Sequence, residues 1–480
     1  MVKKQNSSGE MQLITVNKNH ADALSDQICD ELLKLFGSRL HAGDRLPSVR
    51  QLASQLGVSA WTVNEAYQRL MARGMVTSHP GLGYFVSKLA PRLESPRVAH
   101  RPKMGTMNAV SFVRNAVEPS SHAVSASTGF LPRAWINNAI PPAVMRKVLR
   151  DPVITVPAPA HGLLEFRHQL TTKLSQANIH VNPDQIVTTY GVTQAVSLIC
   201  QKVLQAGDCV VIEDPSYMVQ QTQLRDLGVE LLAVPRRHDG PDLDVLECIV
   251  QQFRPRIVFT QCTLHNPTGT TSSPANCYGL LSLADKYDFL IIEDDVFGDL
   301  APKSALKLAA LDAFRRVFYV SSFTKLLSPA VRVGFLIGPP TYTEGILEQK
   351  ILSTLTGSSL LEAIVSHTLK SGSYGAHING LRRTLTKAHH SARIALLQAG
   401  VVIESEASDG LFIWGELPST TNVDNLMKEA DHNGILLTKG SMFSPTGSFE
   451  RHLRFNVAHA ADPKLLEFLR PFTRPKSHAG

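Results

Sequence analysis

The sequence of 480 residues is 43% hydrophobic, which is enough for two or three domains and a large apolar core. Its six cysteines are scattered without a Cys-x-x-Cys pair, so a disulfide scaffold and a zinc site are both unfavoured and no metal is expected. No apolar run approaches membrane-spanning length, and residues 1–10 do not lead into the apolar core of a signal peptide. We therefore expect a soluble, cytoplasmic protein without a membrane partner.

The net charge of +7 is concentrated in one segment. Residues 39–103 hold ten lysine and arginine residues against three acidic residues, whereas the rest of the sequence is balanced. A local basic surface suits a polyanion such as DNA, although a solvated charged face is the common alternative for such a run.

Three helices are predicted near the N-terminus. Apolar residues recur at helical spacing over residues 21–36. Ser48 begins a second helix with Gln51 as its capping-box partner, and Gly57 ends it. Ser59 caps the third helix. The close pair of helices is typical of a helix-turn-helix, whose second helix enters the major groove of DNA by its N-terminal residues. Here those residues are Ser59, Ala60, Trp61, Thr62 and Asn64.

A short strand, a turn over residues 80–83 and the run Tyr84–Val86 predict a hairpin wing behind these helices. The segment resembles the GntR family of winged-helix repressors. The resemblance spans nearly all of residues 20–87 and is carried by Gly43-Asp44-Arg45-Leu46-Pro47-Ser48, Leu52-Ala53, Leu56-Gly57-Val58-Ser59, Thr62-Val63 and Gly81-x-Gly83-x-Phe85-Val86.

This resemblance implies binding to double-stranded DNA. Arg50 would contact a backbone phosphate or a base, Thr62 would lie in the recognition groove, and the wing would add Gly81 and Gly83. The family usually carries arginine where Ala60 stands, so one expected contact is missing. Trp61 could compensate for it, or could pack against the first helix instead. A three-helix bundle without DNA contact is the remaining alternative.

The sequence divides into three predicted regions. Residues 14–88 form the winged helix-turn-helix domain. Residues 89–120 are dotted with proline and basic residues and predict a linker. Residues 121–480 form the second domain, in which strands and helices alternate. Its predicted strands are the apolar runs 185–190, 209–213, 256–260, 289–293 and 317–320.

Near-continuous apolar strands separated by helices predict an open parallel α/β sheet, in which a ligand lies beyond the carboxyl ends of the strands. Residues with useful chemistry follow those ends, namely Gly191–Thr193, Pro215–Tyr217, His265–Gly269, Asp294–Asp295 and Lys325. Lys325 has hydroxyls before it and an arginine seven residues after it, which suits an imine-forming lysine beside a phosphate. A Ser-x-x-Lys pattern alone is a weak signal.

Together these residues resemble the fold-type I pyridoxal-phosphate enzymes of the aminotransferase class, over roughly residues 125–470. With a GntR-like winged helix in front, the whole chain resembles a MocR-type regulator. The resemblance implies that Lys325 bonds the pyridoxal phosphate as an imine, Asp294 pairs with the ring nitrogen, Asn266 donates to the ring oxygen and Tyr217 stacks on the ring. The phosphate would be held by Val192, Thr193, Ser322 and Arg332, because a helix N-terminus favours an anion.

Arg454 matches the arginine with which this class binds a substrate carboxylate, so the implied ligand is an amino acid or a related acid. Each of these residues also has a plain structural alternative: a turn carboxylate for Asp294, an ordinary turn at Asn266, a core tyrosine for Tyr217 and a surface arginine for Arg454.

Two departures from the aminotransferase pattern bear on catalysis. Phe297 stands where the fold usually places a tyrosine that hydrogen-bonds the ring oxygen. Residues 156–162 contain no match for the tyrosine that often reaches the partner subunit's phosphate. Both departures suggest a pocket tuned more for binding than for turnover.

The sequence therefore predicts a homodimeric, DNA-binding transcription regulator whose aminotransferase-like domain binds pyridoxal phosphate and senses an amine or amino acid. One alternative is an active aminotransferase with an appended DNA-binding domain. A second alternative is a domain that has lost the cofactor and serves only for dimerisation.

Overall fold

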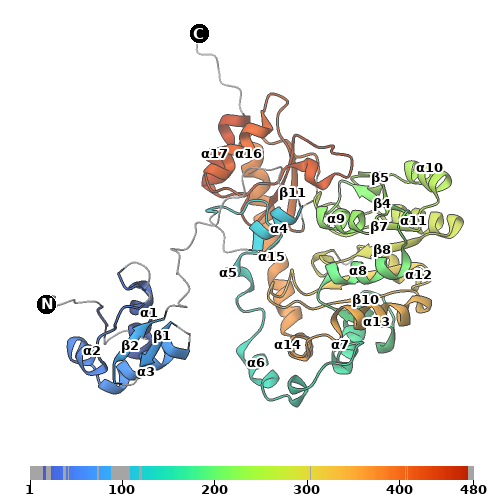
Figure 1. Cartoon of the computed structure of the whole chain (residues 1–480). Coiled ribbons are helices and arrows are strands. Elements are labelled where there is room, and N and C mark those ends of the chain that lie inside the picture. Colours follow the sequence, from blue (N-terminus) through green and yellow to red (C-terminus); the bar gives the residue numbers. More distant parts are fainter. Residues whose placement is uncertain are drawn as a thin grey trace, which may run out of the picture. The chain divides into compact units, whose positions relative to one another are not determined.

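The computed structural model describes residues 14–17, 23–35, 39–41, 43–72, 75–79, 81–87, 109–117, 122–302, 304–405, 407 and 409–473. The chain divides into two compact units, residues 1–106 and residues 107–480 (Figure 1). None of the helices in these ranges is long and apolar enough to cross a membrane.

The first unit is a winged helix with its own apolar core. Its elements are α1 (Leu24–Leu35), α2 (Val49–Leu56), α3 (Ala60–Ala72), β1 (Val76–His79) and β2 (Gly83–Val86). The two strands pair antiparallel, with Val76 opposite Val86. The core joins one face of each helix to the wing, and it includes Ile28, Leu32, Leu52, Val63, Tyr67, Leu70, Val76 and Val86.

The turns of this unit confirm the helix boundaries that the sequence predicts. Ser48 and Gln51 form a capping box at the start of α2, and Gly57 ends that helix in the left-handed conformation with φ of 61°. At the start of α3 the backbone N–H of Thr62 donates to Oγ of Ser59 at 3.0 Å.

The second unit begins earlier than the sequence suggested. A helix, α4 (Ala109–Val117), lies within the range 89–120 that was predicted to be a linker, and it belongs to the unit of residues 107–480. Its Phe112 is buried, with 3% of its surface exposed. An alternation of small and apolar residues over nine positions is a weak signal beside the prolines and arginines that precede it, so composition did not reveal the helix.

The second unit is built on an eight-stranded sheet of order β3-β10-β9-β8-β7-β4-β5-β6. These strands are β3 (Val187–Thr189), β4 (Cys209–Asp214), β5 (Glu230–Arg237), β6 (Gly240–Pro241), β7 (Ile257–Thr260), β8 (Leu290–Asp294), β9 (Val317–Ser322) and β10 (Gly334–Ile337). The predicted open α/β sheet is confirmed, but it is mixed and not parallel throughout, because β10 runs antiparallel to both β3 and β9, and β6 runs antiparallel to β5. A separate pair, β11 (Phe412–Glu416) and β12 (His452–Asn456), is antiparallel.

The large sheet is buried on both faces, which explains its near-continuous apolar strands. Val211, Val258 and Ile291 point into one apolar cluster. Their neighbours Ile257 and Ile292 point into another, since successive strand residues alternate between the faces.

Helices cover the sheet and supply the turns that carry the site (Figure 1). After α4, the helices of the second unit are α5 (Arg133–Ile136), α6 (Pro142–Val148), α7 (Leu164–Ser175), α8 (Val192–Val203), α9 (Met218–Asp226), α10 (Leu243–Phe253), α11 (Pro274–Tyr287), α12 (Leu308–Asp312), α13 (Pro340–Thr354), α14 (Ser359–Lys370), α15 (Ser373–Gln398), α16 (Val423–His432) and α17 (Pro463–Thr473), of which the last two lie beside β11 (Figure 1). Short 3-10 turns lie at Pro152–Thr155, Pro183–Gln185, Gly298–Leu300 and Gly440–Phe443.

Candidate functional site

The predicted site residues of the second unit come together where the parallel strands end. Asp294 is the last residue of β8, and Lys325 follows β9 by three residues. Tyr217 lies between β4 and α9, and Asn266 lies in the loop after β7. Arg454 reaches the same place from β12. This convergence is what a sheet with parallel central strands produces at its carboxyl edge.

The amine of Lys325 lies in a half-buried, positively charged environment. Burial, joined by the charges of Arg454 and Arg332, lowers the pKa of Lys325 to about 8, and Asp294 opposes this shift. The Nζ atom lies 4.2 Å from the ring centroid of Phe130. A lysine whose pKa is brought near neutrality has a substantial neutral fraction, and the neutral amine is the nucleophile.

Asp294 is a buried carboxylate held by two donors. The side chain of Gln220 donates from Nε2 to Oδ2 at 2.9 Å, and the backbone N–H of Val296 donates to Oδ1 at 3.0 Å. Burial raises the pKa of Asp294 to about 6, and these two hydrogen bonds oppose the rise. Its neighbour Asp295 has a different task, because it accepts hydrogen bonds from Lys307 and Tyr319 in the core. Asp294 is thus the carboxylate of the pair that is available to a cationic ring nitrogen.

The start of α8 forms a small polar cradle. Gly191 precedes the helix with φ of 90°, and no side chain in the described part of the chain caps the first turn. A Cβ at Gly191 would lie 3.2 Å from Nη2 of Arg332 and 3.6 Å from Oγ of Ser322. The first backbone amides, those of Val192 and Thr193, therefore have a guanidinium and a hydroxyl beside them, a donor set that suits a phosphate. The hydroxyl of Ser322 also lies within hydrogen-bond distance of Oγ1 of Thr324 and of the carbonyl of Val333, to which it can donate.

Arg454 is a buried guanidinium between aromatic rings. It is 1% exposed, and its Cζ lies 4.4 Å from the ring centroid of Phe412 and 4.7 Å from that of Phe443. Nη1 donates to Oδ1 of Asn266 at 2.7 Å, and Nη2 donates to the carbonyl of Ser127. Burial lowers the pKa of Arg454 to about 10, while Tyr217 opposes the shift. The suggestion that Arg454 is a surface residue at a strand edge is therefore wrong.

Asn266 faces the site with its amide group oriented by Arg454. Oδ1 of Asn266 accepts a hydrogen bond from Nη1 of Arg454. The other atom of the amide, Nδ2, therefore remains as a hydrogen-bond donor toward the site. Its backbone N–H donates to Oε1 of Gln261 at 3.0 Å. Phe297 is buried at 2% exposure and meets Phe412 edge to face at 5.7 Å, so this position supplies ring packing and no hydrogen bond.

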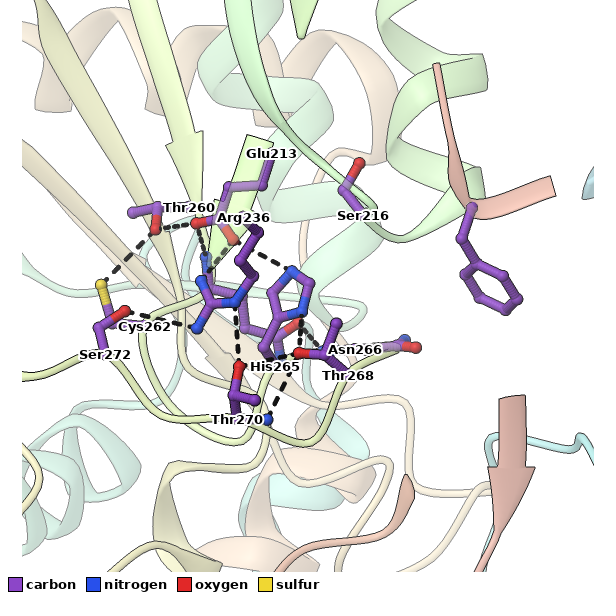
Figure 2. Close-up of polar contacts among 12 residues, drawn as sticks. Glu213, Ser216, Arg236, Thr260, Cys262, His265, Asn266, Thr268, Thr270 and Ser272 are labelled. Carbon is purple, nitrogen blue, oxygen red and sulfur yellow. Dashed lines mark hydrogen bonds and ion pairs between the residues drawn. The ribbon is translucent and has the colours of Figure 1, made fainter. Parts of the chain in front are cut away.

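A buried polar network fixes the loop that carries Asn266 (Figure 2). Arg236 pairs with Glu213, and the side chains are 0% and 2% exposed. Nε2 of His265 lies 3.1 Å from Oε2 of Glu213, and Nδ1 lies 2.9 Å from Oγ1 of Thr268. Burial alone would raise the pKa of Glu213, but the charges of Arg236 and His265 and the hydrogen bonds lower it to about 2. The network therefore ties β4 and β5 to the turn that begins at His265.

Protonation of His265 is expected to loosen this network. Burial, together with the charge of Arg236, lowers the pKa of His265 from 6.5 to about 4. The unfolded chain therefore binds this proton more readily than the folded chain, so stability is full above the unfolded pKa and is lost as pH falls toward the folded one. The loss attributable to His265 between about pH 7 and about pH 5 is roughly 2 kcal/mol in the free energy of unfolding.

Urea unfolding at the two pH values measures this effect. His265→Gln is expected to be less stable at neutral pH but to lose less stability on acidification than the wild type. The exposed histidine at position 180 offers a control, since His180→Gln should keep the wild-type pH dependence. An unchanged pH dependence in His265→Gln would show that the histidine does not titrate between its folded and unfolded states as described.

The predicted DNA-binding residues lie on α2, α3 and the wing of the first unit. Arg50 on α2 is exposed, and the side chain of Trp61 near the start of α3 is 71% exposed. Trp61 therefore does not pack against the first helix. Thr62 is engaged with the capping Ser59, their hydroxyl oxygens being 2.7 Å apart. Asn64 accepts a hydrogen bond from the wing residue Tyr84.

The wing turn depends on two glycines. Gly81 and Gly83 have φ of 76° and 104°, conformations that favour glycine. Their part in DNA contact remains a prediction, because their observed role is to shape the turn.

Three side chains near these sites were missed by sequence reasoning. Gln220 bonds Asp294, Phe112 lies over Arg454 with its ring centroid 5.8 Å from Cζ, and Nε of Arg45 lies 3.5 Å from the place that a Cβ at Gly83 would take. Gln220 lies three residues after Tyr217, which places it on the same side of α9. This spacing is the one feature of the sequence that could have indicated its contact with Asp294. Among the described residues, no group of three His, Cys, Asp or Glu side chains could hold a metal ion.

Comparison with known families agrees with this geometry. The model of aminotransferase class I and II matches residues 127–471, and that of the bacterial regulatory proteins of the gntR family matches residues 24–86. The chain therefore belongs to the aminotransferase class I and II family and carries a GntR-type helix-turn-helix region in front of that domain. This combination places it in the MocR-type subfamily of GntR regulators, as the sequence predicted.

Individual relatives share one or both units. The chain is 28% identical over 446 residues to the HTH-type transcriptional regulator YdcR of Escherichia coli (strain K12), covering 90% of this chain and 94% of the relative. It is 26% identical over 372 residues to the probable rhizopine catabolism regulatory protein MocR of Rhizobium meliloti, covering 73% and 72%. The crystal structure of LysN, the alpha-aminoadipate aminotransferase of Thermus thermophilus complexed with N-(5'-phosphopyridoxyl)-L-leucine, superposes with a TM-score of 0.69 and 25% identity over 75% of this chain and 95% of LysN.

Proposed function

We propose that this protein is a transcription regulator that binds DNA through its winged helix and senses an amino acid through a pyridoxal phosphate held in its aminotransferase-like domain. The observation that carries the proposal is the convergence of Lys325, Asp294 and Arg454 on one buried site within a chain that also has a GntR-type unit. The names of YdcR and MocR as regulators support the regulatory role.

The residues of the site fit pyridoxal phosphate. The cradle at the start of α8 would hold the phosphate, with the amides of Val192 and Thr193 beside Arg332. Asp294 would hold a protonated ring nitrogen, and its pKa near 6 keeps it largely ionised at neutral pH. The bound cofactor supplies an aldehyde that forms a covalent bond with primary amines. Phosphopyridoxyl leucine in LysN supports a cofactor of this type.

The ligand class follows from two charged side chains. Lys325 marks the place where an amine reacts, and Arg454 is a cation that no carboxylate of the described residues approaches within 4.0 Å. An amine and a carboxylate on one small molecule satisfy both, so an amino acid is the favoured effector. We further propose a homodimer, the usual assembly of the aminotransferase fold.

An active aminotransferase remains the second candidate, and the aminotransferase activity named for LysN supports it. Cofactor-loaded protein mixed with amino acids and 2-oxo acids separates the two functions. A sensor should give a change in visible absorption that persists without product, whereas an enzyme should convert one acid into the other. Rapid, sustained conversion would overturn the proposal of a dedicated sensor.

Replacing Arg50 with alanine is expected to weaken DNA binding roughly tenfold at physiological salt and to lower the slope of affinity against salt by about one unit, because one phosphate contact is lost. Binding to a duplex from upstream of this protein's own gene, titrated at several salt concentrations, measures both quantities. Lys34→Ala removes the same charge from an exposed position of α1 and should leave the salt slope close to that of the wild type. Equal slopes for Arg50→Ala and the wild type would remove Arg50 from the interface.

A further inference from the structure

Helix α4 lies against the effector site, although the sequence suggested only a linker there. Its buried residue Phe112 packs with Met218, Leu436 and Phe443 in a small apolar cluster. Through this cluster α4 lies beside α9, the helix that begins directly after Tyr217 (Figure 1). The helix therefore contacts the elements that would hold both the cofactor ring and the ligand carboxylate.

Three aromatic rings enclose the guanidinium of Arg454. The ring centroids of Phe412, Phe443 and Phe112 lie 4.4, 4.7 and 5.8 Å from Cζ. Arg454 is 1% exposed, so its guanidinium is covered in this structure, and these rings are among the groups beside it that a ligand carboxylate would have to displace. Phe412 belongs to β11 and to the main core, and Phe443 is fully buried. Phe112 is the farthest ring and stands on a helix of nine residues, so it is the ring that can leave at the lowest cost.

The guanidinium also has bonding capacity for a ligand. Nη1 and Nη2 donate to neutral oxygens, those of Asn266 and Ser127. The remaining nitrogen, Nε, is buried with no hydrogen-bond partner among the described residues. A buried cation with an unused donor is costly to maintain, so an arriving carboxylate has a large favourable interaction with which to displace a ring.

We propose that α4 is part of the effector site: the carboxylate of a bound amino acid displaces Phe112 from Arg454 and releases α4. This inference rests on the proposed function, since it takes an amino acid as the ligand. In the sequence, residues 88–108 lie between the wing and α4, so α4 is the first described element that follows the winged helix. The ligand carboxylate and Phe112 of α4 compete for the guanidinium of Arg454. The ligand can therefore shift the equilibrium between docked and released α4 only by the coupling free energy between ligand binding and α4 docking.

Hydrogen exchange of the full-length, cofactor-loaded protein tests the release of α4. The probes are L-alanine, L-leucine and L-phenylalanine, each paired with the amine that lacks only the carboxylate, namely ethylamine, isoamylamine and phenethylamine. Amino acids that shift the visible spectrum should accelerate exchange in a peptide covering residues 109–117, because release exposes the helix amides to local opening. The matched amines should shift the spectrum without that acceleration.

Two variants of α4 sharpen the test. Phe112→Ala removes the competing ring, so the apparent affinity for the amino acid should rise roughly tenfold and exchange over residues 109–117 should already be fast without ligand. Val110→Ala truncates a residue of the same helix that is 66% exposed and should behave as the wild type. The affinity for the matched amines should be the same in both variants.

The outcomes separate this inference from the proposed function. A spectral shift with unchanged or slower exchange of α4 overturns the displacement of Phe112 and leaves the sensing function intact. Weaker amino-acid binding in Phe112→Ala also overturns it, since the ring would then be assisting the ligand. The absence of a spectral shift with every amino acid and every amine overturns the proposed function and the inference together.

Discussion

Replacing Lys325 with alanine is expected to abolish covalent retention of pyridoxal phosphate and the visible absorption band that accompanies it. Burial lowers the pKa of Lys325 to about 8. Lys325 therefore lies in the cofactor site and also has a neutral fraction that can act as a nucleophile. Loss of the covalent link should weaken cofactor binding by at least about a hundredfold, or ~3 kcal/mol. Absorption spectra before and after extensive dialysis measure the effect.

Lys350 provides a matched control, because it is a lysine with a similarly lowered pKa that lies outside the cofactor site. Burial also lowers its pKa to about 8, but its Nζ donates to Oγ1 of Thr188 at 3.1 Å and to the carbonyl of Ala160. Lys350→Met should therefore keep the cofactor band, with circular dichroism showing whether the variant is folded. Retention of the band in Lys325→Ala and its loss in folded Lys350→Met would show that the reactive lysine has been assigned to the wrong residue.

Replacing Arg454 with glutamine is expected to weaken binding of an amino acid by about 2–5 kcal/mol, which is roughly thirtyfold to several thousandfold. The reason is that the buried carboxylate of the ligand would lose its charged, hydrogen-bonding partner. A matched amine without the carboxylate should bind Arg454→Gln and the wild type with nearly equal affinity. Spectral titration with L-leucine and isoamylamine measures this difference.

Arg451→Gln is the control for Arg454→Gln. Arg451 directly precedes β12, its side chain is 49% exposed, and it pairs with Glu416. Its replacement should leave both affinities unchanged, because an exposed ion pair contributes little and lies outside the site. If L-leucine bound Arg454→Gln as tightly as the wild type, the effector would be an amine, or its carboxylate would bind elsewhere.

The positions of the main site residues could be predicted because they follow strand ends. Asp294 and Lys325 are 31 residues apart in the sequence, yet parallel neighbouring strands must bring their carboxyl ends to the same edge. The capping residues Ser48 and Ser59 could also be predicted, since each accepts a hydrogen bond from the backbone N–H of the residue three positions later. Local geometry and strand direction are the parts of a fold that short patterns encode.

Contacts between distant segments could not be predicted in the same way. The antiparallel direction of β10 was hidden, because a strand buried on both faces is apolar throughout whichever way it runs. The pairing of Gln220 with Asp294 depends on how α9 lies over the sheet. The docking of Phe112 on Arg454 joins residues 342 positions apart, and nothing in the composition around α4 indicated it.

The most direct measurement of the central claim is reductive trapping of the full-length protein. Cofactor-saturated protein is treated with borohydride, digested, and mapped by mass spectrometry. We expect one phosphopyridoxyl modification, on Lys325, in the same preparation that binds duplex DNA. A modification on another lysine, or none on Lys325, would contradict this expectation.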